Sequence, residues 1–165
     1  MRILGIDPGL GTTGYGIIDA EKDKFRLLEA GVIQTSSKNS IQERLKKIYR
    51  GINELIQKFR PNALVLEKLY SHYKHPVTAL LMGHSRGVVC LASGEKSIPL
   101  VNYPAKRIRK AVTGNGNASK EQVQRMVQNI LGLSEMRVPN DVTDALAVAI
   151  AHSYIKSRYK LGSKL

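Results

Sequence analysis

The opening stretch, MRILGIDPGLGTTGYGIID, constrains this chain more than any other part of its sequence. An apolar run ends on a carboxylate at Asp7, and Pro8, Gly9 and further glycines follow at once. An apolar run bounded by proline and glycine predicts a buried strand followed by a tight turn. An aspartate in such a turn is often only a turn former whose side chain binds nearby amides. The other motifs must therefore decide whether Asp7 has a chemical role.

Further strands and one amphipathic helix follow from the pattern of apolar residues. Segments 1–7, 14–23 and 25–35 predict an antiparallel meander of three strands. Apolar residues then recur every three or four positions between basic ones, which predicts a helix closed by a proline: Ile41, Leu45, Ile48, Ile52, Leu55 and Phe59. The short apolar run 62–66 predicts a buried parallel strand, and it also ends on a carboxylate, Glu67.

The second half of the chain predicts a helix over 77–93, a last strand over 97–103, and then a basic segment with a Gly/Asn turn. Two more helices begin near Ser119, which fits a capping box, and near Asn140. The order βββ-α-β-α-β-α-α predicts an α/β fold in which helices cover both faces of a mixed sheet. We expect a single domain over 1–165 with a basic tail from about residue 157.

Composition narrows the class of function. Lys and Arg number 26 against 13 Asp and Glu, a formal net charge of +13, which indicates a polyanionic partner and first of all nucleic acid. The single cysteine, Cys90, excludes an intrachain disulfide, and no Cys/His spacing suits structural zinc. The sequence has no leader pattern and no apolar run near the roughly 20 residues that span a bilayer. We expect a soluble cytosolic protein and no membrane partner.

Carboxylates recur where the predicted elements meet. If the strands ending at Asp7 and Glu67 are parallel neighbours joined by a right-handed crossover, their carboxylates converge at one sheet edge. Asp141 and Asp144 lie three residues apart and share one face of the last helix's first turn. That pair also has a purely structural reading, because acids at a helix start act as caps and are favoured by the helix dipole.

Crowded carboxylates raise each other's pKa unless cations neutralise them. A cluster of oxygen ligands without Cys or His suits Mg²⁺ or Mn²⁺. Two such ions about 4 Å apart hold a phosphodiester, activate water and stabilise the leaving oxygen. A basic protein with such a cluster has what a nuclease or transposase needs.

At these residues the chain resembles the RuvC-type Holliday junction resolvases of the ribonuclease H-like superfamily. The resemblance rests on the segments 3–18, 111–127 and 141–152, together with LVLEKLY and the GHSRG helix, and covers nearly the whole chain. It implies a five-stranded ribonuclease H-like sheet. It also implies a homodimeric, Mg²⁺-dependent endonuclease that makes symmetric paired nicks in a four-way DNA junction and leaves ligatable 5′-phosphate and 3′-hydroxyl ends.

The resemblance assigns roles to individual positions. Asp7, Glu67, Asp141 and Asp144 would be catalytic ligands of two Mg²⁺ per active site, with Mn²⁺ as a substitute, and Lys120 would lie near the scissile phosphate. The residues expected to contact DNA are Tyr70, Lys74, Arg86, Lys106, Arg107, Arg109, Lys110 and Lys120. The RuvA–RuvB branch-migration complex is the further partner that the resemblance suggests, and the bacterial cytosol, with association to the nucleoid when DNA is bound, is the location it implies.

The chain departs from the family pattern at several of these positions. Arg109 stands where relatives have Lys, which keeps the charge and changes the donor geometry. Tyr70 stands where they usually have Phe, and it is expected to stack on an exposed base, the alternative being that it only packs the loop. The loop 71–78 is longer, and GHSRG replaces GQARG. Because of these departures, the family's cleavage-sequence preference is not transferred.

A helix-spaced apolar stripe within 77–93 has two interpretations. Such a stripe is normally core, but in the family this helix forms the dimer interface, and a two-fold dimer matches the near two-fold symmetry of a four-way junction. The interface residues predicted in this way are Leu80, Leu81, His84, Val88 and Leu91.

Three other functions compete with junction resolution. DPGLGTT resembles the phosphate-binding hairpin of actin-like nucleotide phosphotransferases, but these need two lobes to enclose the nucleotide. A non-catalytic basic DNA-junction-binding protein would not need all four acids, which are present. A relative of the same fold that acts on RNA is disfavoured by the chain length and the GHSRG and TGNGNASK segments.

Overall fold

The computed structural model describes residues 1–21, 24–69 and 76–162. The described elements are, in order, β1 (Arg2–Asp7), β2 (Thr12–Glu21), β3 (Lys24–Gln34), α1 (Ile41–Phe59), β4 (Ala63–Glu67), α2 (Pro76–Glu95), β5 (Leu100–Tyr103), α3 (Ala105–Thr113), α4 (Lys120–Leu131) and α5 (Asn140–Gly162). None of these helices is both long enough and apolar enough to cross a membrane.

The strands form one mixed sheet in the order β3-β2-β1-β4-β5. The meander β1-β2-β3 is antiparallel, whereas β4 runs parallel to β1 and to β5. Ile6 pairs with Leu66 in the parallel ladder, so the residues that end β1 and β4, Asp7 and Glu67, lie side by side. The predicted five-stranded mixed sheet is confirmed.

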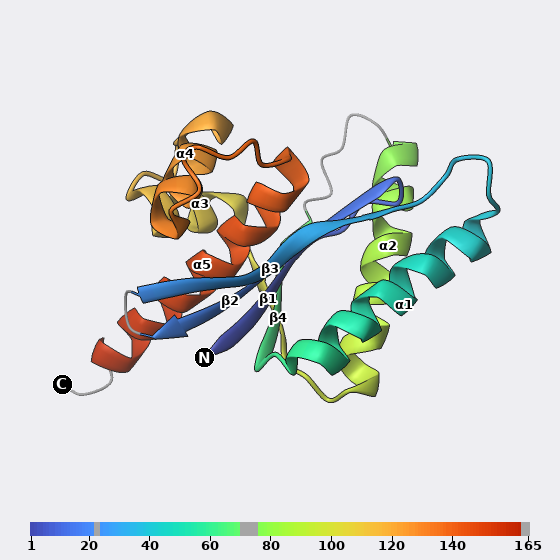
Figure 1. Cartoon of the computed structure of the whole chain (residues 1–165), viewed down its shortest axis with the longest axis horizontal. Coiled ribbons are helices and arrows are strands. Elements are labelled where there is room, and N and C mark those ends of the chain that lie inside the picture. Colours follow the sequence, from blue (N-terminus) through green and yellow to red (C-terminus); the bar gives the residue numbers. More distant parts are fainter. Residues whose placement is uncertain (22–23, 70–75, 163–165) are drawn as a thin grey trace.

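Helices cover both faces of this sheet, as the sequence predicted (Figure 1). Side chains alternate along a strand, so odd and even residues enter different cores. Leu4, Ile6 and Leu66 pack with α1 and α2, whereas Ile3 and Val65 pack with α3, α4 and α5. Helix α5 is buried along most of its length, which explains its nearly continuous apolar sequence.

Two glycines, one on β1 and one on β2, allow α5 to lie close against these strands near Asp7. A Cβ built at Gly5 would lie 2.0 Å from the carbonyl oxygen of Ala145, and one built at Gly14 would lie 2.1 Å from that of Asp141. Gly14 is the residue that pairs with Asp7 across β1 and β2. The absence of side chains here brings the first turn of α5 to the end of β1.

Helix α3 corrects the sequence analysis, which left its residues as an irregular basic segment. Ile108 and Val112 lie one turn apart and are buried, and the helix ends at Gly114, whose φ is +82°. The many exposed cations around these two apolar residues hid the helical period. Helix α5 is also longer than expected, because its backbone continues to Gly162 through most of the predicted basic tail.

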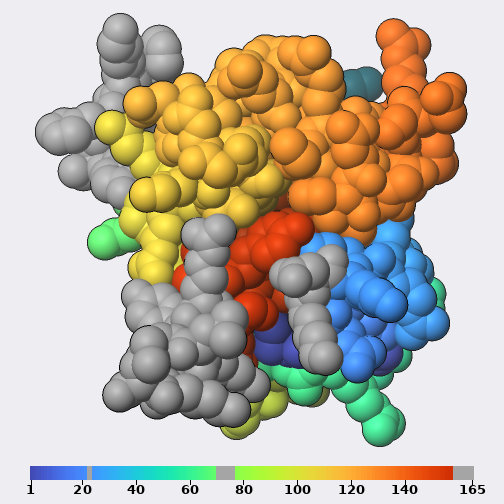
Figure 2. Space-filling model, turned by 90° about the vertical axis from the view of Figure 1, so that its left-hand side faces the viewer, coloured from blue at the N-terminus to red at the C-terminus, as the bar shows by residue number. Residues whose placement is uncertain are grey.

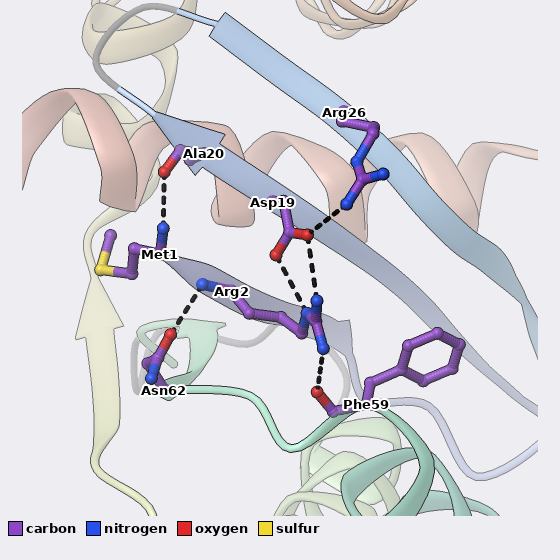
Figure 3. A network of polar contacts seen from close by, with 7 residues as sticks. All are labelled: Met1, Arg2, Asp19, Ala20, Arg26, Phe59 and Asn62. Carbon is purple, nitrogen blue, oxygen red and sulfur yellow. Dashed lines mark hydrogen bonds and ion pairs between the residues drawn. The ribbon is translucent and has the colours of Figure 1, made fainter.

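At the sheet end opposite Asp7, an arginine joins several elements (Figure 3). The Arg2 guanidinium donates to both carboxylate oxygens of Asp19 at 2.9 and 3.0 Å and to the carbonyl of Phe59 at 2.8 Å. Arg26 donates to the same carboxylate at 2.9 Å. Hydrogen bonding by Arg2 lowers the pKa of Asp19 to about 2, so this carboxylate is charged at neutral pH. The charged carboxylate binds arginines of both neighbouring strands and so supports the register of β1, β2 and β3.

Candidate active site

Acidic and basic side chains from separate elements meet in one pocket of about 290 Å³. Asp7 and Glu67 reach it from the ends of β1 and β4, and Asp144 reaches it from the first turn of α5. The cations that line it are Lys68, Arg86, Arg109 and Lys120. The structure thus brings together three of the four predicted carboxylates with the predicted lysine. Asp141 borders this group and does not line the pocket itself.

Lys120 is held in the site by its helix cap and by an ion pair. The Ser119 hydroxyl accepts from the Gln122 amide at 3.3 Å, and the Gln122 side chain accepts from the Ser119 amide at 2.8 Å, which confirms the predicted capping box. Lys120 follows as the first residue of α4, and its ammonium lies 2.7 Å from a carboxylate oxygen of Asp144. The cap and the site are therefore built from adjacent residues.

The electrostatics of the site follow from burial and crowding. Burial, the largest cause, and the charges of Asp144, Asp141 and Glu67 together raise the pKa of Asp7 to about 6, while Lys120 opposes them. Burial also raises the pKa of Glu67, although Arg109 and Lys120 counteract the effect. Asp141 thus acts on Asp7 through its charge. Burial and the neighbouring acids therefore both disfavour the charged form of Asp7, although four cations line the same pocket.

This donor set fits hard divalent cations. In the part of the chain that the structure describes, no three His, Cys, Asp or Glu side chains are already grouped closely enough to hold a metal ion. The Lys120 ammonium pairs with one oxygen of Asp144, and the negative charges of Asp144, Asp141 and Glu67 repel that of Asp7. A divalent cation would replace the ammonium at Asp144 and relieve the unfavourable charge on Asp7. The oxygen-only donors favour Mg²⁺ or Mn²⁺ over zinc.

The predicted DNA contacts occupy different settings. Lys106 and Lys110 are exposed on α3, which lies beside α4 in Figure 2, and Arg109 lines the pocket from the same helix. The Arg107 guanidinium stacks over the Tyr103 ring, 5.4 Å from its centroid. Tyr70 and Lys74, which were also predicted to contact DNA, lie outside the described residues.

Arg86 has a contact that the sequence analysis missed. Its guanidinium donates to the backbone carbonyl of Glu67 at 2.8 Å and to the side-chain oxygen of Asn102. Neither Asn102 nor the close approach at Gly14 was singled out from the sequence. Gly14 could have been found by pairing the predicted hairpin, since it lies opposite Asp7.

The apolar stripe of α2 divides into two parts. Leu80 and Leu91 are 67% and 55% exposed, and Leu81 and His84 are exposed as well. Val88 is half-buried and packs against the core formed with α1. In the structure most of the stripe therefore lies on the surface rather than in the core.

Comparison with known proteins adds an independent line of information. A model of the family described as crossover junction endodeoxyribonuclease RuvC matches residues 3–152. The protein of that name from Rhodopirellula baltica is 44% identical over 153 residues, which cover 93% of this chain and 86% of that protein. Its counterpart from Fusobacterium nucleatum is 41% identical over 165 residues, or 100% of this chain and 84% of the relative.

Solved structures agree with these relatives. RuvC of T. thermophilus in complex with a Holliday junction substrate has a TM-score of 0.91 and 34% identity, with 96% of each chain covered. The yeast mitochondrial Holliday junction resolvase Ydc2 has a TM-score of 0.65 at 16% identity, covering 99% of this chain and 84% of that one. The second likeness shows a shared fold alone.

Proposed function

We infer, from the premise that this chain belongs to the RuvC family of crossover junction endodeoxyribonucleases, that the carboxylate pocket is the catalytic centre of a nuclease. The chain is a Holliday junction-resolving endonuclease of DNA recombination and repair. The observation that carries the assignment to this pocket is the convergence of Asp7, Glu67 and Asp144 with Lys120 inside the matched region.

The proposed metal is Mg²⁺, two ions per active site, with Mn²⁺ as a substitute. Its ligands would be Asp7, Glu67, Asp141 and Asp144. After burial, the charges of the other three acids are what raises the pKa of Asp7, and a bound cation would offset that repulsion, which supports this set. When bound, such ions polarise the scissile phosphate, lower the pKa of water and stabilise the leaving oxygen. The products would be 5′-phosphate and 3′-hydroxyl ends.

The chain's own side chains supply binding and orientation. Lys120, once its ammonium is free of Asp144, donates to an oxygen of the scissile phosphate. Arg109 offers a planar fork of donors to a neighbouring phosphate, and Lys106 and Lys110 extend the basic surface along α3. Deprotonated Asp7 provides a ligand oxygen, so the reaction requires loss of the proton that the metal-free site favours below about pH 6.

We propose that two copies associate through α2. The exposed leucines of this helix, Leu80, Leu81 and Leu91, form the apolar surface that supports the proposal. A two-fold dimer presents two pockets in matching orientation to a nearly two-fold junction, and paired nicks follow from that symmetry. Membership of the family supports the RuvA–RuvB complex as a further partner.

Cleavage of a labelled mobile four-way junction tests the proposal. We expect paired, symmetric nicks with Mg²⁺ or Mn²⁺, no cleavage with EDTA, and products that DNA ligase reseals. A linear duplex of the same sequence serves as the control and should remain intact. Junction binding without cleavage under every cation condition would instead support the non-catalytic junction-binding function.

A further inference from the structure

The backbone carbonyl of Glu67 has an unusual position in the sheet. Leu64 donates its amide to the Pro99 carbonyl at 2.9 Å, and Lys68 donates to that of Tyr103 at 2.8 Å, so the even-numbered residues of β4 bond toward β5. Successive residues of a strand direct their backbone polar groups to opposite sides. The carbonyl of Glu67 therefore faces away from β5, toward β1.

The β1 side cannot supply a donor at this point. Met1 and Ala20 exchange both of their backbone hydrogen bonds, so odd-numbered residues of β1 face β2 and even-numbered residues face β4. The register that pairs Ile6 with Leu66 then places residue 8 opposite the Glu67 carbonyl. Residue 8 is Pro8, which has no N–H. A carbonyl without a partner in a partly enclosed site costs free energy.

Arg86 fills this vacant position from outside the ladder. One amino group of its guanidinium donates to the Glu67 carbonyl at 2.8 Å, and the other donates to the Asn102 side chain on β5. The fixed fork of donors on a guanidinium allows it to join two acceptors in one plane, which a lysine ammonium does with less geometric control. Arg86 therefore joins the ends of β4 and β5 to α2.

The side chains on the two faces of β4 enter different cores. Leu64 and Leu66 point into the core beneath α1 and α2, whereas Val65 points into the core beneath α5. Side-chain alternation sends Glu67 with Val65. Arg86 comes from α2 and binds the backbone carbonyl of Glu67, and its side chain also lines the pocket that holds the carboxylate.

We propose that Arg86 is a positioning residue, which replaces the donor that Pro8 lacks and thereby fixes the strand end that carries Glu67. The proposal rests on the catalytic role proposed for Glu67. It also gives α2 a mechanical link to the active site, because the same helix carries the exposed leucines. Arg86 was expected from the sequence to contact DNA, and the two roles differ in what they predict for binding.

Two measurements separate these roles: junction affinity in EDTA across a salt series, and the single-turnover cleavage rate at saturating protein. For Arg86→Met we expect the cleavage rate to fall about 10- to 100-fold, as misplacement of a reacting group by about 1 Å does. Junction affinity and its salt dependence should stay at the wild-type values. Asn102→Ala should lower the rate in the same direction by less, and Arg50→Met, which removes an exposed arginine of α1, should leave the rate unchanged.

A backbone rescue provides the sharpest readout. Pro8→Ala restores an amide at residue 8, so the double variant Pro8→Ala, Arg86→Met should cut faster than Arg86→Met alone. A role of Arg86 as a phosphate contact would not be repaired by one new N–H at that position. Failure of this rescue would contradict the claim that Arg86 replaces the missing donor.

Other outcomes overturn the proposal or its premise separately. A normal saturating rate for Arg86→Met, with weaker binding and a salt slope reduced by about 1, would make Arg86 a phosphate contact. If Arg86→Met does not fold, Asn102→Ala carries the test, and a wild-type rate overturns the proposal. Glu67→Gln tests the premise: wild-type cleavage by that variant would remove the catalytic role of Glu67, whatever Arg86 does.

Discussion

Gly14→Ala should disable the active site while leaving the fold intact. The added Cβ would lie 2.1 Å from the carbonyl oxygen of Asp141 and 2.4 Å from its carbonyl carbon. Ordinary contact between such atoms is about 3.5 Å, so the backbone at the start of α5 must move by roughly 1 Å or more. Because Gly14 pairs with Asp7, the movement separates Asp141 and Asp144 from Asp7.

We expect the single-turnover rate of junction cleavage to fall about 100-fold, as it does when reacting groups are misplaced by about 1 Å. Overpacking should also lower the free energy of unfolding by about 1–3 kcal/mol. Gly11→Ala is the matched control on the same hairpin, because a Cβ there meets no atom within 4 Å. Equal cleavage rates for the two variants would refute the argument that close packing at Gly14 positions the acids.

Three further predictions address other parts of the molecule. Burial lowers the pKa of His152 to about 4 from its ordinary value near 6.5, so the stability present above pH 6.5 is lost as pH falls toward 4. Between pH 7.5 and 5, the free energy of unfolding measured with urea should fall by about 2 kcal/mol more for the wild type than for His152→Gln. An equal pH dependence of the two proteins would contradict this. Lys120→Met removes the ammonium paired with Asp144, so cleavage should slow about 100-fold while junction binding in EDTA weakens far less, and a wild-type rate would exclude Lys120 from the reaction. Leu80→Glu should shift sedimentation from dimer to monomer and abolish paired nicking, whereas Met136→Glu, at a residue of similar exposure outside α2, should do neither. An unchanged dimer would remove α2 from the interface.

The sequence predicted the placement of Asp7 and Glu67 because each ends an apolar run that one right-handed crossover makes a parallel neighbour of the other. The pairing of Asp141 and Asp144 on one helical face followed from their spacing. Their catalytic role remains a prediction. The oligomeric state and the DNA contacts at Tyr70 and Lys74 also remain predictions.

Features that depend on three-dimensional approach were not predictable in the same way. Helix α3 was missed because only Ile108 and Val112 mark its buried face among many cations. The charge of Arg86 suggested DNA, whereas its contact with the Glu67 carbonyl depends on ladder register and on the orientation of α2. The ion pair between Lys120 and Asp144 joins residues of different helices, so the spacing of residues along the sequence could not predict it.

The measurement that tests the central claim most directly compares wild type with Asp7→Asn on a labelled mobile four-way junction, with binding measured in EDTA and cleavage in Mg²⁺. Asp7→Asn keeps the size of the side chain and removes the carboxyl group, whose pKa the site raises to about 6. We predict paired symmetric nicks by the wild type, and a variant that binds the junction normally without cutting it. Equal cleavage by both proteins would contradict the account and leave Asp7 as a residue of the turn.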